Sequence, residues 1–167
     1  IRALINSIIV VFCSCLFNCI IASMAAYGFT KKKFPGREVI FRIYLLTLMI
    51  PGQVTMIPVF IMMNKAGLTN TYFALIVIIL NAFGVFLIRQ FMIGVPNELL
   101  EAARIDGLNE YGIFARVALP LVKPGIATLV IFTFVNIWND FMGPLIYLNS
   151  TELKTIQLGI RMFISQY

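Results

Sequence analysis

The sequence predicts an all-α, polytopic membrane protein, and two observations support this fold class. Of the 167 residues, 60% are apolar and 12% are charged, and the mean hydropathy is +0.95. Soluble domains are usually about half apolar and about a quarter charged. The charges are also unevenly placed, since none occurs in 3–30, 43–64 or 66–88. Each of these stretches exceeds the about 20 residues that a helix needs to cross a bilayer.

We expect a single transmembrane domain over residues 1–167. Its predicted spans are 4–29, 43–64, 71–93 and 125–148. Only Asp140 interrupts the apolar run of the fourth span. The first run is longer than the about 7 to 15 apolar residues of a secretory signal, so it should stay in the membrane. Its cysteines, Cys13, Cys15 and Cys19, have no metal-ligand spacing, which favours a packing role.

The basic residues predict the orientation of the spans. The segments 30–42 and 94–124, with Arg89 just before the second, hold nine of the 13 Lys and Arg residues. By the positive-inside rule these two loops are cytoplasmic and both chain ends lie outside. Residue 1 is Ile rather than Met, and the chain stops at Tyr167 in an outer loop. We therefore expect a fragment of a longer protein with a missing upstream span.

Small and helix-breaking residues indicate that the spans pack against other helices. Ser14, Asn18, Ala22 and Ala26 recur every four residues, which places small side chains on one helical face. The second span contains Pro51-Gly52-Gln53 and Pro58, which remove backbone donors near its middle. This break fits a kinked packing helix as well as a helix that lines a pathway.

Four polar residues and one phenylalanine inside the third and fourth spans are candidates for lining a pathway. These candidates are Asn81, Phe83, Asn136, Asn139 and Asp140. A carboxylate in lipid is costly, so Asp140 should face water or a partner group. Because Asp140 falls near the outer end of its span, interfacial anchoring and an interhelix pair remain alternatives.

The cytoplasmic loop after the third span predicts a short helix. Its start and stop signals are an N-cap, an acidic first turn and a terminal glycine: Asn97, Glu98, Glu101 and Gly107. Helical periodicity gives it two faces, Leu99, Leu100 and Ala103 against Glu98, Glu101 and Arg104. A second short helix can begin after Asn109 and run to Pro120. Such a helix is either gripped in the groove of another protein or is a simple surface connector.

At these residues the loop resembles a known motif. Glu101-Ala102-Ala103, Gly107, Val117 and Leu119-Pro120 are similar, in type and spacing, to the EAA motif of permease subunits in bacterial ABC importers. Val117 stands where that motif usually has Ile. Other segments resemble the carbohydrate-uptake, maltose-transporter-like branch: Asn6-Ser7, Phe34-Pro35-Gly36-Arg37, Pro51-Gly52-Gln53, Trp138-Asn139-Asp140 and Pro144-Leu145. The resemblance covers nearly the whole chain and implies the ABC importer permease fold, with one further span before Ile1 and one after Tyr167.

The resemblance also implies a function and partners. The chain would be an inner-membrane permease subunit for sugars or oligosaccharides, working with a second permease subunit, two cytoplasmic ATPase subunits and an extracytoplasmic solute-binding protein. The helix over 98–107 would be the coupling helix that sits in an ATPase cleft. The implied ATPase-coupling residues are Glu98, Glu101, Ala102, Ala103, Asp106, Gly107, Leu119 and Pro120. Among them, Ala102 and Ala103 would allow close approach and Gly107 would form the corner.

The chain itself is not expected to be an enzyme. It has no phosphate-binding G-x-x-x-x-G-K-[ST] run and no His. We expect it to bind no metal or cofactor, with ATP and Mg²⁺ held by the partner subunits, and to bind no nucleic acid. Alternatives are an importer for a polyol, a glycerol-phosphate compound or an amino acid, and a membrane scaffold or secondary carrier without an ATPase.

Overall fold

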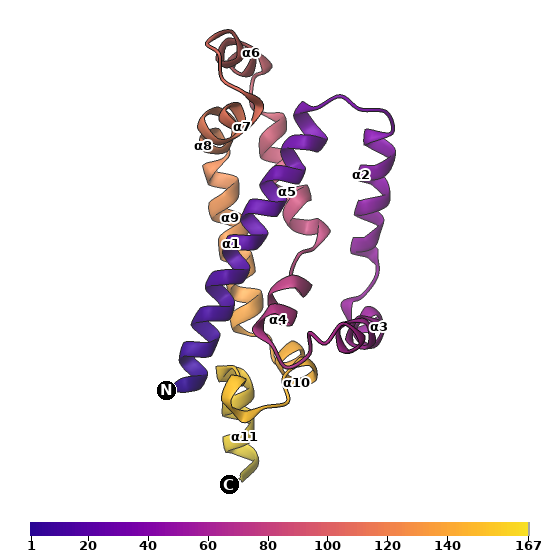
Figure 1. The fold of residues 1–167 in the computed structure, drawn as a ribbon, viewed down its shortest axis with the longest axis vertical. Helices are drawn as coiled ribbons and strands as arrows, with labels where there is room; N and C mark the ends of the chain where they lie inside the picture. The colour runs from indigo at the N-terminus through magenta and orange to yellow at the C-terminus, as the bar shows by residue number, and fades with distance from the viewer. Residues whose placement is uncertain (167) are drawn as a thin grey trace. The chain divides into compact units, whose positions relative to one another are not determined.

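The computed structural model describes residues 1–166, and this part of the chain consists of helices without strands (Figure 1). The predicted all-α class is confirmed. The elements are α1 (Arg2–Lys31), α2 (Arg37–Leu46), the 3₁₀ turn η1 (Thr47–Met49), α3 (Gly52–Lys65), α4 (Tyr72–Ile78), α5 (Ala82–Ile93), α6 (Asn97–Ile105), α7 (Glu110–Ile113), the π-helix η2 (Phe114–Ala118), α8 (Leu119–Leu121), α9 (Lys123–Trp138), α10 (Met142–Tyr147), the 3₁₀ turn η3 (Thr151–Leu153) and α11 (Ile156–Gln166).

Among the described residues, one helix is by itself long and apolar enough to cross a membrane, namely α1. Three further candidates pass only as pairs of helices separated by a bend: α2–η1 with α3, α4 with α5, and α7–α8 with α9. Up to four spans result if each bent pair counts as one. The expected stretches 43–64, 71–93 and 125–148 are therefore not continuous helices.

Local chemistry explains where these stretches break. Pro51 precedes α3 with extended backbone (φ −58°, ψ 132°), which ends the preceding helical turn. Pro58, by contrast, lies inside α3, so only the first of the two prolines marks the break. Asn81 begins α5 as its N-cap, and the fourth stretch is interrupted between Trp138 and Met142.

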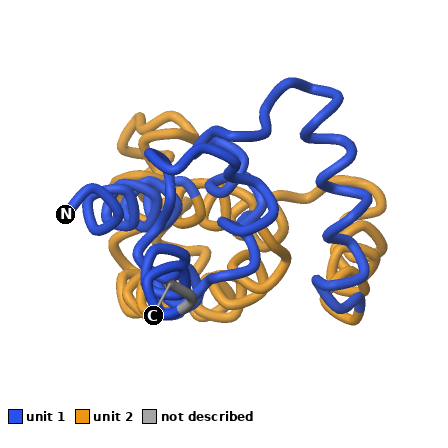
Figure 2. Tube along the Cα trace, turned by 90° about the horizontal axis from the view of Figure 1, so that it is seen from below, with its two compact units in different colours: residues 1–17, 50–80, 132–167 blue, residues 18–49, 81–131 orange. Residues whose placement is uncertain are grey.

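The described chain forms two compact units, which Figure 2 shows in different colours. Unit 1 comprises 1–17, 50–80 and 132–167, and unit 2 comprises 18–49 and 81–131. In unit 1, side chains near the start of α1 hold the segment before α11. The Nδ2 of Asn6 donates to the carbonyls of Glu152 (2.7 Å) and Lys154 (3.0 Å), and the N–H of Ile156 donates to the Oγ of Ser7 (2.9 Å).

Unit 2 has one apolar core, to which α1, α2, α5, α6, the α7–α8 segment and α9 contribute. Its fully buried side chains include Ile88, Met92, Ile113 and Val122. The core thus extends from the long apolar helices into the short helices of the 94–124 loop. The 94–124 loop is therefore packed against α1, α5 and α9 through buried apolar side chains.

Small residues bring the long helices of unit 2 close together. The stripe Ser14, Asn18, Ala22 and Ala26 is buried along α1, as the four-residue spacing predicts, and its last three residues belong to unit 2. A Cβ at Gly84 of α5 would lie 3.1 Å from the Oδ1 of Asn18 and 3.3 Å from both the Ala22 Cβ and the Leu129 Cδ1. Glycine at this position therefore allows α5 to approach α1 and α9 closely.

Candidate functional site

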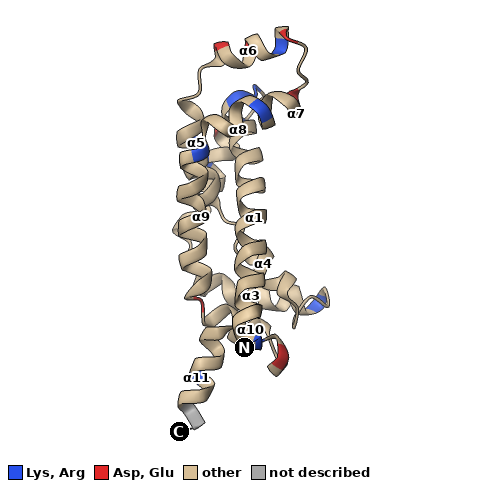
Figure 3. Ribbon diagram, turned by 90° about the vertical axis from the view of Figure 1, so that its left-hand side faces the viewer, with Lys and Arg blue, Asp and Glu red and all other residues tan. Residues whose placement is uncertain are grey.

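The helix α6 presents one face to the core of unit 2 and the other to solvent. Leu100 and Ala103 are buried in the core, whereas Glu98, Glu101, Ala102 and Asp106 are exposed. The ribbon in Figure 3, coloured by residue type, shows positions of acidic and basic residues along α6, α7 and α8. Leu99, which the helical wheel places with the buried face, is instead 45% exposed.

The two alanines of the EAA-like run have different surroundings. Ala103 packs into the apolar core of unit 2, while Ala102 faces solvent. Ile105 is 87% exposed although it is apolar. Its position about 140° round the helix from Leu100, at 100° per residue, places it on the same solvent face as Ala102. The exposed face of α6 thus combines the acidic side chains Glu98, Glu101 and Asp106 with the apolar Ile105 and Ala102.

The start of α6 is held by the end of α1. Asn97 is the first residue of the helix rather than its cap, because Pro96 occupies the N-cap position. The Nζ of Lys31 donates to the carbonyl of Val95 (2.5 Å) and to the Oδ1 of Asn97 (3.0 Å). Asn97 therefore uses its side chain to contact α1, which its predicted capping role did not anticipate.

The end of α6 is a glycine corner, as the sequence predicts. Gly107 has a left-handed backbone (φ +85°). Its N–H donates to the carbonyl of Arg104 (3.1 Å), and the N–H of Leu108 donates to the carbonyl of Ala103 (3.1 Å). This pair of bonds is a Schellman motif, which satisfies the last carbonyls of the helix. Only glycine adopts this conformation without steric cost.

The second short helix begins where the sequence predicts it. The Oδ1 of Asn109 accepts a hydrogen bond from the N–H of Gly112 (2.8 Å) and so caps α7. The helix then widens into η2, and single π-helical turns are often found at functional sites. Leu119 is half-buried and Pro120 exposed in the first turn of α8, where a missing N–H is tolerated.

The carboxylate of Glu110 joins three parts of unit 2. Its Oε1 pairs with the Nη2 of Arg104 at 2.8 Å. Its Oε2 accepts a hydrogen bond from the Oη of Tyr27 (3.1 Å) and forms an ion pair with Lys32. The hydrogen bond from Lys32, helped by those from Arg104 and Tyr27, lowers the pKa of Glu110 to about 2 despite the opposing effect of burial.

This pKa gives a pH prediction. Because the pKa in the folded state (about 2) lies below the ordinary value of 4.5, the contribution of Glu110 to stability should be complete above about pH 4.5 and be lost as the pH falls towards 2. The check is the difference in melting temperature between the wild type and Glu110→Gln in detergent across this range. A difference already gone at about pH 6 would contradict the assignment.

Three of the five candidate pathway residues bind backbone near them in the chain. The Oδ1 of Asn81 accepts from the N–H of Phe83 (3.1 Å) and of Gly84 (3.4 Å), which caps α5. The Nδ2 of Asn139 donates to the carbonyl of Val135 (2.8 Å). The third, Asp140, is described next. Phe83 is half-buried and Asn136 is exposed.

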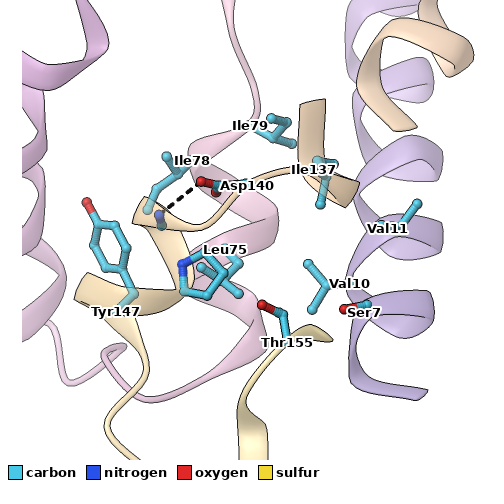
Figure 4. A pocket seen from close by; sticks show the side chains of 12 residues that line it. Ser7, Val10, Val11, Leu75, Ile78, Ile79, Ile137, Asp140, Tyr147 and Thr155 are labelled. Carbon is cyan, nitrogen blue, oxygen red and sulfur yellow. Dashed lines mark hydrogen bonds between the residues drawn. The ribbon is translucent and has the colours of Figure 1, made fainter. Parts of the chain in front are cut away.

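Asp140 borders a small cavity in unit 1, shown in Figure 4. Its Oδ1 accepts a hydrogen bond from the N–H of Gly143 (3.1 Å), in the first turn of α10. The cavity has a volume of about 50 Å³ and is otherwise lined by side chains such as Ser7, Leu75 and Thr155. A space of this size holds on the order of one to a few water molecules, which is less than a sugar ring needs.

Sequence reasoning missed several residues of this site. Ile105 and Tyr111 are apolar or aromatic and are 87% and 79% exposed. For Ile105 the helical wheel carried a signal, because an apolar residue there falls on the charged face. For Tyr27, Lys32 and Glu110 no local signal existed, since their contacts join segments about 80 residues apart in the chain.

These features define a class of protein: an all-helical membrane protein with interrupted spans and a docked amphipathic helix on the loop before its last long apolar helix. The chain belongs to the family of binding-protein-dependent transport system inner membrane components, whose family model matches residues 18–166. The predicted permease family is thereby confirmed. The family consists of transport components, not of enzymes.

Relatives and solved structures agree with this assignment. The chain is 41% identical over 162 residues to an arabinooligosaccharides transport system permease protein of Halalkalibacterium halodurans, covering 96% of this chain and 57% of the relative. It is 36% identical to a lactose transport system permease protein of Rhizobium radiobacter, covering 97% and 60%. The chain thus spans less than two thirds of the length of these relatives.

The fold also matches a crystal structure of a bacterial ABC transporter involved in the import of the acidic polysaccharide alginate. The TM-score is 0.91 at 27% sequence identity, with 99% of this chain and 59% of the other chain covered. The predicted ABC importer permease fold is therefore confirmed.

Proposed function

We propose that this chain is part of the permease subunit of an ATP-driven ABC importer for sugars or oligosaccharides. The observation that carries the proposal is α6, an exposed amphipathic helix that is firmly packed on the long helices of unit 2. Similarity to proteins named for the transport of arabinooligosaccharides and lactose and for the import of alginate supports carbohydrate as the substrate class.

In this proposal α6 is the coupling helix and docks into a cleft of an ATPase subunit. Its solvent face supplies Glu98, Glu101 and Asp106 for charged contacts, and Ala102 and Ile105 for close apolar contact. A cleft of matching chemistry would offer both an apolar surface and basic groups. Gly107 sets the corner, and Ala103 anchors the helix in the core of unit 2. Leu119 and Pro120, in the first turn of α8, complete the proposed coupling segment.

The proposed assembly contains two ATPase subunits, a second permease subunit and an extracytoplasmic solute-binding protein. ATP and Mg²⁺ are bound by the ATPase subunits, and this chain binds no cofactor of its own. In the inner membrane, the segments 30–42 and 94–124 face the cytoplasm, in keeping with their excess of Lys and Arg. Closure of the ATPase pair then moves α6 as a rigid body, and the packed core carries that movement into the long helices, giving alternating access.

The test is reconstitution of the full-length protein from its host with the partners encoded beside it. The complex should retain a nucleotide-binding subunit in mild detergent and take up labelled oligosaccharides into vesicles only with ATP and the binding protein. Uptake of a polyol or an amino acid instead of oligosaccharides would show that the substrate class is not carbohydrate. Purification without any nucleotide-binding subunit would favour a scaffold or secondary carrier and contradict the proposal.

A further inference from the structure

The strongest unassigned feature is the carboxylate of Glu110, which lies outside the EAA-like residues. Each of its oxygens faces a different part of unit 2. Oε1 contacts Arg104 of α6 at 2.8 Å, and Oε2 contacts Tyr27 in α1 and Lys32 just beyond α1. One side chain at the start of α7 therefore ties the end of α6 to the end of α1.

The start of α6 is tied to the same place by an independent contact. Lys31, the last residue of α1, donates to the carbonyl of Val95 (2.5 Å) and to Asn97 (3.0 Å). The neighbouring Lys32 reaches the other end of α6 through Glu110. Two consecutive lysines thus fasten both ends of one helix. If α6 were fastened to α1 at one end only, it could pivot about that contact. Because it is fastened at both ends, a movement of α6 is passed on to α1.

The contacts of Glu110 with Tyr27, Lys32 and Arg104, called the joint below, form a network rather than an isolated surface ion pair. Isolated exposed ion pairs contribute little to stability, whereas networks with several well-placed partners contribute more. The Lys32 ammonium also lies 5.6 Å from the Tyr27 ring centroid, and that ring packs edge-on against Phe114 at 5.3 Å. The side chains of Lys32, Glu110 and Arg104 are 37%, 45% and 55% exposed. The ion pair of Arg2 and Glu152 in unit 1 is longer, at 3.9 Å, and its side chains are more exposed, at 81% and 79%.

We propose that Glu110 is a positioning residue that couples α6 to the end of α1, so that displacement of α6 moves the first long helix directly and not only through the shared apolar core. This inference rests on the proposed transport function, because that function supplies the displacement. It assigns a specific route by which the movement enters the membrane-spanning part. Glu110 itself contacts neither substrate nor nucleotide in this account.

The first arm of the test measures transport. In the reconstituted complex, Glu110→Gln should reduce uptake per ATP hydrolysed about tenfold, with the ATPase subunits still bound. Lys32→Met breaks the same joint from α1 and should have a similar effect, while the double variant should be no worse than either single one. Glu152→Gln, the same change in the exposed pair of unit 1, is the matched control and should resemble wild type.

The second arm measures backbone hydrogen exchange of the full-length protein and needs no transport. Glu110→Gln should raise exchange about tenfold both in 27–33 and in 97–105, with the amides of α9 unchanged as an internal reference. If exchange rises only around 110–113, the two ends are not coupled and the inference is wrong.

The transport outcomes separate the inference from the proposed function. If wild type transports and Glu110→Gln transports equally well, the inference is wrong and the proposed function still stands. An effect of the double variant that is the product of the single ones, about a hundredfold, also overturns it, because the residues then act independently. Loss of the ATPase subunits from Glu110→Gln would make Glu110 a docking residue and contradict the inference. If wild type shows no ATP-driven uptake, the proposed function fails, and the exchange arm still decides whether the joint exists.

Discussion

Replacing Gly107 by proline in the full-length protein should abolish ATP-driven uptake while leaving the protein inserted in the membrane. Gly107 has φ +85°, and its N–H donates to the carbonyl of Arg104. Proline fixes φ near −65° and has no N–H, so the corner after α6 cannot form. The cost is on the order of 3 kcal/mol or more, which is about a hundredfold in the population of the formed corner. Uptake by reconstituted vesicles measures the effect.

The chain offers a matched control at the end of α3. Gly67 has φ +68°, and its N–H donates to the carbonyl of Asn64 at 3.0 Å, while Leu68 donates to Met63 at 2.9 Å. This is the same Schellman geometry in unit 1, away from α6 in the sequence. Gly67→Pro should therefore lower stability similarly but retain most of the coupled uptake. Equal loss of uptake in both variants would mean that misfolding, not the α6 corner, explains the result.

The second large effect should come from enlarging Gly84. Even a single Cβ added at this position would lie only 3.1 to 3.3 Å from side-chain atoms of Asn18, Ala22 and Leu129. Leucine would force α5 away from α1 and α9, at a cost of about 1 to 3 kcal/mol or more. We expect a clear fall in the melting temperature of the detergent-solubilised protein, with a smaller fall for Gly84→Ala.

Gly28 provides the comparison for this packing argument. It lies within α1, and a Cβ there would meet nothing within 4 Å. Gly28→Ala should raise the free energy of unfolding by up to about 1 kcal/mol, because alanine favours the helix over glycine. The two alanine variants should therefore change stability in opposite directions. A stabilising Gly84→Ala would show that α5 does not pack closely against its neighbours.

The α6 corner could be predicted from the sequence because its chemistry is local. A helix that ends at a glycine in left-handed conformation needs only the residues next to it, and Gly107 has this role. The N-cap role of Asn109 follows the same logic. The break before α3 follows from Pro51, and the buried stripe of α1 follows from its four-residue spacing.

The remaining contacts of the site depend on tertiary structure. Nothing near Glu110 in the sequence indicates that its carboxylate meets Tyr27 and Lys32. Asn97 has the chemistry of a cap, yet its side chain contacts Lys31 because Pro96 already occupies the cap position. For polar residues at helix breaks, the nearest backbone groups compete with more distant ones. Asn81 and Asp140 accept hydrogen bonds from such neighbouring N–H groups.

Docking of α6 into an ATPase cleft is the central claim, and site-directed cross-linking tests it most directly. With Cys13, Cys15 and Cys19 replaced by serine, a single cysteine is placed at Ile105, which is 87% exposed on α6, or at Ile57, which is 70% exposed on α3. We predict that Ile105→Cys cross-links to the ATPase subunit in the assembled complex and that Ile57→Cys does not. Absence of a cross-link at Ile105, in a complex that still hydrolyses ATP and transports, would contradict the account.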